Sequence, residues 1–237
     1  MFIIITIFTF KSNTETTMRF FEIFSSRRAD KLIEAIDSLL DKVDHSLIVF
    51  KDGVRNYLYD DTSSFKDNLA SMATLEAEAG VLRHDIENSL YSRGYLIRSR
   101  GDIMRLLERF DHIISIISND LIQFEIEAPK IPNELKKEFV KLSELASMAV
   151  ESSIPGTKAY FNDPDTVAET TSRVYFYEKE AVKLSQSIKR TVFHDMDSLK
   201  LSEKFHLRYF ALHIEDLAKA AVKVAEQLSV MAIKRNL

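Results

Sequence analysis

The chain has 237 residues, of which 46% are hydrophobic, and a formal net charge of −4 at pH 7. It contains no cysteine, which excludes disulfides, thiolate zinc sites and cysteine nucleophiles. Only five glycines and four prolines occur, and long stretches repeat with the period of a helix. These features predict a nearly all-helical, all-α protein, and the net negative charge argues against nonspecific binding to nucleic acid.

The N-terminal segment, residues 1–17, opens with the apolar run MFIIITIFTF. This run is too short to span a bilayer, and it lacks the basic region and the cleavage site of a signal peptide. The next methionine, Met18, opens the segment MRFFEIFSSRRADKL. We predict that the natural protein starts at Met18 and that residues 1–17 are a non-native or disordered extension. The alternative is an added strand or an interfacial anchor.

Turn-forming residues and prolines divide the rest of the chain, residues 18–237, into six predicted helices within a single domain. The first helix covers residues 29–58, and the next four begin near residues 65, 99, 133 and 165. Between the fourth and fifth helices, residues 154–164 contain two prolines and a glycine, which predicts a non-helical stretch. The sixth helix contains the cleanest heptad pattern, over residues 207–231, with alanines beside it.

The second and fifth predicted helices carry two versions of one segment, LEAEAGVLRHDIENSL (75–90) and YEKEAVKLSQSIKRTV (177–192). Both have a core face that repeats every three or four residues, as in a coiled coil. Glu76 and Glu178 interrupt these faces at equivalent positions, and Ser185 stands where the first copy has Arg83. The duplication predicts a chain built from two related halves.

The two glutamates are predicted to face the core, where an isolated charge costs several kcal/mol. Each carboxylate must therefore be paired, protonated or bound to a cation. One interpretation pairs Glu76 with Arg83, one heptad away, or pairs each glutamate with a lysine of a neighbouring helix. The other interpretation is that both glutamates are metal ligands. The residues alone do not decide between these two interpretations.

Four segments, in order and with matching spacing, resemble the PhoU-like family, specifically the phosphate transport regulators found with Pit-type phosphate permeases. The segments are LEAEAGVLRHDIENSL, RGDIMRLLERFDHI (100–113), YEKEAVKLSQSIKRTVF and HIEDLAKAAVKVAEQL (213–228), preceded by FFEIF after Met18. The resemblance covers about residues 18–235. It implies a six-helix bundle made of two three-helix repeats, at about residues 29–128 and 133–235.

Members of the family closest to PhoU bind metal clusters through acidic pairs of the form E/D-x-x-x-D, whose carboxylates share one helix face. By this resemblance, the chain has only one acid of each pair. These acids are Glu76, Asp111, Glu178 and Asp216. The positions of the missing acids are occupied by Gly80, Ser115, Val182 and Leu212. An alternative alignment makes His213 the counterpart of Asp111. The resemblance therefore implies at most weak binding of a divalent metal or iron, with help from Glu78, Asp85 or His213.

Two histidines, His84 and His112, neighbour these acids. They could supplement a metal site, and the alternative for each is a surface position.

The resemblance implies a non-enzymatic, cytoplasmic regulator or adaptor of inorganic phosphate transport. Its partner would be a Pit-type phosphate permease or a signalling protein, so it would reach the inner face of the membrane only through that partner. No nucleophile elbow, P-loop or H-E-x-x-H motif occurs, so the sequence does not predict an enzyme. The alternatives are a carboxylate-rich metal-binding bundle and a structural oligomerisation module. A homo-oligomer is compatible with all three.

Overall fold

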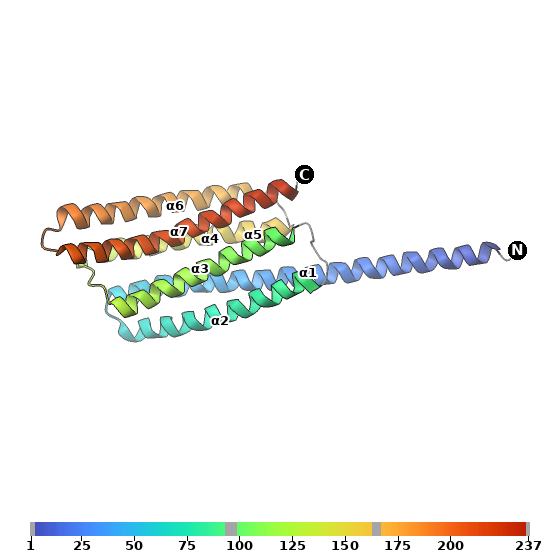
Figure 1. Cartoon of the computed structure of the whole chain (residues 1–237), viewed down its shortest axis with the longest axis horizontal. Coiled ribbons are helices and arrows are strands. Elements are labelled where there is room, and N and C mark those ends of the chain that lie inside the picture. The colour runs from blue at the N-terminus through green and yellow to red at the C-terminus, as the bar shows by residue number, and fades with distance from the viewer. Residues whose placement is uncertain (1–2, 93–98, 163–166, 236–237) are drawn as a thin grey trace.

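The computed structural model describes residues 3–92, 99–162 and 167–235, and every regular element in this part of the chain is a helix. The helices are α1 (Ile3–Leu58), α2 (Thr62–Ser92), α3 (Arg100–Glu127), α4 (Asn133–Glu151), α5 (Ser153–Asn162), α6 (Val167–Arg190) and α7 (Leu201–Arg235), with a π-helical turn, η2 (Thr191–Asp195), after α6. The long helices lie side by side in one bundle, and the N-terminal part of α1 extends beyond it (Figure 1). The predicted all-α bundle is confirmed.

The bundle has two halves, which correspond to the two predicted repeats. The first half contains α1, α2 and α3, and the second contains α6, α7 and the pair α4 and α5, which are separated only by Ser152. Between the halves, α3 packs against α7 and α1 packs against α4. Equivalent helices of the two repeats therefore face each other across the interface, which is consistent with the predicted two-repeat layout.

A single hydrophobic core joins the two halves. Phe124 of α3 is fully buried at this junction. Its ring centroid lies 4.9 Å from that of Tyr57 on α1 and 4.6 Å from that of Phe210 on α7. One side chain thus contacts both repeats.

Two predictions about helix boundaries were wrong. The first helix begins at Ile3 rather than at residue 29, because no proline or glycine precedes Gly53 to end it. Where translation of the natural protein starts stays a prediction. Residues 153–162 form α5, although residues 154–164 were predicted to be non-helical.

Helix α5 tolerates its proline and its glycine for two local reasons. Pro155 lies in the first turn, where a missing N–H breaks no helical hydrogen bond. Gly156 faces α6 so closely that an added Cβ would lie 2.5 Å from Cγ2 of Thr170. Pro155 is therefore compatible with the start of α5, and Gly156 allows α5 to pack closely against α6.

None of the helices in the described residues is both long enough and apolar enough to cross a membrane.

Candidate functional site

A groove runs between α3 and α7, at the interface of the two repeats. It consists of two adjoining cavities of about 420 Å³ and about 260 Å³, which share His112, Ala220 and Lys223 in their walls. Three residues singled out from the sequence, His112, His213 and Asp216, line the larger cavity. We refer to the part around Asp120, His213, Asp216 and Lys219 as the acidic end of the groove.

Asp120 is the most deeply buried charged group at the acidic end, with only 2% of the residue exposed. Its Oδ1 atom lies 3.4 Å from Nδ1 of His213 on α7. The other carboxylate oxygen, Oδ2, is buried without a hydrogen-bond partner among the described residues. An unpaired buried oxygen of this kind costs free energy, so the site favours a proton or a positively charged group here.

The pKa values of this pair follow from its geometry. Burial raises the pKa of the Asp120 carboxyl above its ordinary value of 3.8, and this effect outweighs the hydrogen bond and the charge of His213, which act to lower it. The hydrogen bond to Asp120 raises the pKa of His213 above its ordinary value of 6.5. Both groups therefore hold a proton more strongly in the folded protein than in the unfolded chain.

We expect the free energy of unfolding to decrease as the pH rises above about 6. A raised histidine pKa gives stability that is fully present below the unfolded value and is lost as the pH passes the folded value. Because the His213 side chain is 35% exposed, solvent screens the pair, and we expect a loss of less than about 1 kcal/mol. Urea unfolding between about pH 5.5 and about pH 8.5 measures this change.

The substitution His213→Gln should remove the decrease, whereas His84→Gln, at an exposed position on α2, should leave it in place. An identical pH profile for the wild-type protein and His213→Gln would contradict the assignment.

In the first repeat, the predicted site residues lie at two separate places between α2 and α3. Glu76 is half-buried rather than buried, and its carboxylate accepts a hydrogen bond from the Ser118 hydroxyl at 2.7 Å. Arg83, one of its predicted partners, instead pairs with Glu87 at 2.9 Å and with Asp111 at 3.4 Å. Since Glu76 and Arg83 are seven residues apart, Glu76 and Asp111 lie about two helical turns from each other.

In the second repeat, the predicted site residues lie on two different helices. Glu178 is half-buried on α6, and Asp216 is exposed on α7, where it pairs with Lys219 at 3.0 Å. Among the described residues, no group of three or more histidines and carboxylates is placed to hold a metal ion. Weak metal binding by Glu76, Asp111, Glu178 and Asp216 stays a prediction, which metal analysis of Glu76→Ala and Glu178→Ala would test.

Three buried acids were not predicted from the sequence, namely Asp102, Asp120 and Glu215. Asp102 lies in the first turn of α3, and Lys234 of α7 donates to both of its carboxylate oxygens, at 2.9 and 3.0 Å. For Asp120 a signal exists in the sequence, since it interrupts a second heptad pattern on α3, formed by Leu106, Phe110, Ile113, Ile117, Asp120 and Phe124.

Glu215 forms a separate polar cluster between α6 and α7. Its carboxylate pairs with Lys189 at 3.0 Å and with Lys219 at 2.7 Å. Burial acts to raise the pKa of Glu215, but hydrogen bonds from Lys219, Ser185 and Lys189 together hold it below its ordinary value. The pair with Lys189 joins α6 to α7, and Lys219 lies one turn further along α7, so both cations balance the charge of Glu215 and leave little for a ligand.

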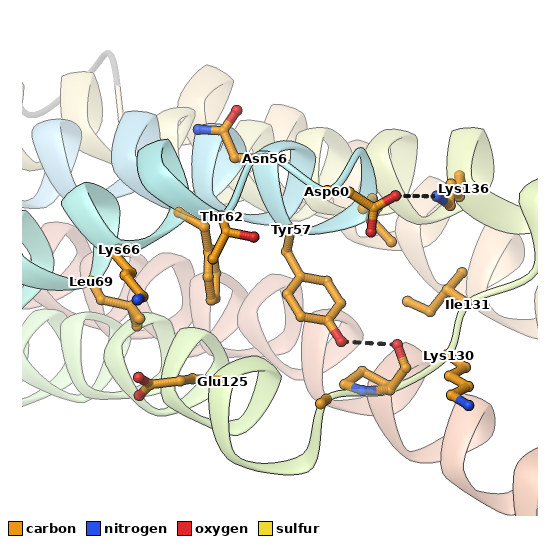
Figure 2. A pocket seen from close by; sticks show the side chains of 14 residues that line it. Asn56, Tyr57, Asp60, Thr62, Lys66, Leu69, Glu125, Lys130, Ile131 and Lys136 are labelled. Carbon is orange, nitrogen blue, oxygen red and sulfur yellow. Dashed lines mark hydrogen bonds and ion pairs between the residues drawn. The ribbon is translucent and has the colours of Figure 1, made fainter.

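The largest of these cavities, about 460 Å³, lies at one end of the bundle, where the turn after α1 meets the connection between α3 and α4. The Tyr57 hydroxyl donates a hydrogen bond to the carbonyl of Pro129 at 2.9 Å. Figure 2 shows Lys136 paired with Asp60 in the same cavity. Burial, and secondly the charge of Asp60, raises the pKa of Tyr57 to about 12, so the hydroxyl keeps its proton. The cavity contains none of the site residues predicted from the sequence. The hydrogen bond from Tyr57 joins α1 to the connection between α3 and α4.

The same arrangement of helices occurs in solved structures. The structure of a protein described as a PhoU-like phosphate regulatory protein, from Shewanella oneidensis MR-1, matches with a TM-score of 0.77 and 17% identity, over 86% of this chain and 99% of that chain. This chain has the PhoU-like fold. A second structure, of a PhoU-like protein from the same organism, matches with a TM-score of 0.76 and 17% identity, over 85% of this chain and 96% of that chain.

Sequence comparison finds relatives that match over most of their length at low identity. A UPF0111 protein of Thermotoga maritima is 27% identical over 213 residues, which are 90% of this chain and 99% of that protein. A UPF0111 protein of Pyrococcus horikoshii is 25% identical over 197 residues, 83% of this chain and 92% of that protein. No family model matches the sequence. The PhoU-like resemblance is confirmed, and the association with a Pit-type permease stays a prediction.

Proposed function

We propose that this protein is a non-enzymatic regulator of phosphate homeostasis that acts through protein contacts with a phosphate permease or a signalling partner. The observation that carries the proposal is the PhoU-like bundle, which extends over 86% of the chain and covers 99% of a protein described as a phosphate regulator. The UPF0111 relatives match over nearly their whole lengths, so the similarity concerns whole proteins rather than one motif.

The surface supports a role in protein contact. Tyr175 and Phe176 are adjacent on α6, and 43% and 60% of these residues are exposed. Aromatic side chains are enriched in protein interfaces, since they provide a large contact area at a small entropic cost. The polar clusters around Asp111 and Glu215 are instead closed by their own ion pairs, which supports a scaffold more than a reaction centre.

Deletion of the gene in the native organism tests this function. We expect the rate of phosphate uptake and the internal phosphate content to change, and we expect the wild-type gene to restore both. Membrane fractions from cells with and without the permease should differ in the amount of this protein, because the partner is what holds it there. Unchanged uptake together with failure to co-purify with any permease or signalling protein would contradict the proposal.

A further inference from the structure

We propose that the α3–α7 groove binds a small phosphate-type oxyanion at the end opposite Asp120. This basic end is the cavity of about 260 Å³ lined by Arg105, Glu108, Arg109, His112, Ala220 and Lys223. The inference goes beyond the proposed function, because that function names a protein partner and this one names a small ligand.

The charge of the basic end differs from that of the whole protein. Three side chains, Arg105, Arg109 and Lys223, are cationic, and Glu108 is the one carboxylate in the wall. The protein as a whole carries a formal charge of −4, so this local excess of positive charge does not follow from its composition. Arg105, Arg109 and His112 follow one another at steps of four and three residues, which places them on one face of α3.

Arg109 provides the strongest evidence for a bound anion. Its Nε atom is buried and has no hydrogen-bond partner in the described part of the chain. A buried donor without an acceptor is unfavourable, and the fork of guanidinium N–H groups matches two oxygens of a phosphate group. The Nε atom itself is covered, so an oxyanion in the cavity would be held by the Nη groups of the same guanidinium, whose residue lies in the cavity wall.

The two other cations are held only by weak pairs and can turn toward a ligand. Lys223 pairs with Glu226 at 3.1 Å, with both side chains about half exposed. Arg105 lies 4.0 Å from Asp102, whose carboxylate is already bound by Lys234. Exposed pairs of this kind contribute little to stability, so a phosphate group can replace them at small cost.

The shape of the groove limits the size of the ligand. Ala220, a small and buried residue, lies in the wall that the two cavities share, and so leaves room beside Arg109 and His112. Toward the other end, Asp120 pairs with His213 and Asp216 pairs with Lys219, so that part of the groove has no comparable excess of positive charge to hold a longer polyanion. The ligand that fits is therefore a compact one, such as inorganic phosphate or pyrophosphate.

Equilibrium dialysis of the full chain with labelled phosphate and labelled pyrophosphate, at constant ionic strength, tests the inference. We expect saturable binding that the double variant Arg105→Gln, Arg109→Gln weakens at least tenfold. The matched control is Lys137→Gln, Lys141→Gln, which removes the same charge from two exposed positions of α4. The control should change binding less than twofold. Arg105→Gln alone, at a side chain that is 66% exposed, serves if the double variant does not fold.

Three results would overturn the inference. They are no saturable binding by the wild-type protein, equal losses in the groove variant and the α4 variant, and binding only to vesicles that contain phosphatidylglycerol. If binding is absent while gene deletion still changes phosphate uptake, the groove assignment fails and the proposed function stands.

Discussion

Replacing Phe124 with alanine is expected to lower the free energy of unfolding by about 3–5 kcal/mol. Phe124 is fully buried, and its ring contacts Tyr57 of the first repeat and Phe210 of the second. The substitution removes contacts in both repeats and leaves a cavity between them that the rigid helices cannot fill. Urea unfolding followed by circular dichroism measures the change.

The control for this prediction is Phe176→Ala, which removes the same atoms from a residue that is 60% exposed. We expect it to cost less than about 1 kcal/mol. Because one core joins the halves, the Phe124 variant should still unfold in a single transition. Two separate transitions would show that the repeats are independent units, and would contradict the prediction of a single domain.

Two glycine substitutions are expected to change stability in opposite directions. Gly156→Ala places a Cβ 2.5 Å from Cγ2 of Thr170, and the stiff threonine side chain cannot move aside without shifting α5 from α6. We expect a net loss of about 1–2 kcal/mol, since overpacking outweighs the gain in helix propensity. At Gly80 an added Cβ meets no atom within 4 Å, so Gly80→Ala should stabilise the protein by about 1 kcal/mol.

Thermal unfolding of the two alanine variants beside the wild-type protein gives the comparison directly. If both variants shifted the midpoint of thermal unfolding equally and in the same direction, helix propensity alone would decide the outcome. The contact between Gly156 of α5 and Thr170 of α6 would then not restrict an added Cβ.

The faces of α2 and α6 could be predicted because each helix buries mainly one side. Met72, Ala79 and Ile86 are buried on α2, as the heptad spacing indicated, and the equivalent face of α6 is buried as well. The spacing could not show that Glu76 lies at the edge of this face. That position depends on where α3 places the Ser118 hydroxyl, which no pattern within α2 encodes.

The candidate groove was predictable only in part, for a related reason. His112, His213 and Asp216 were singled out from the sequence, and all three line it. Asp120 was missed because α3 packs against α1, α2 and α7, so it buries a wide arc that a single heptad pattern does not describe. Arg109 has nothing unusual in its local sequence, and the burial of its unpaired Nε atom becomes apparent only in the packed bundle.

The pairing of α3 with α7, and of α1 with α4, makes the interior seam resemble the interface of a symmetric dimer whose subunits have been joined into one chain. In a symmetric homodimer, any amino-acid substitution occurs in both subunits at once. Here the two repeats are parts of one chain, so a substitution in one is not copied in the other. Asp120 could therefore pair with His213 at one end of the groove while the opposite end became basic. The two ends of the seam therefore differ in charge, and a molecule bound at the basic end, between α3 and α7, would contact both repeats at once.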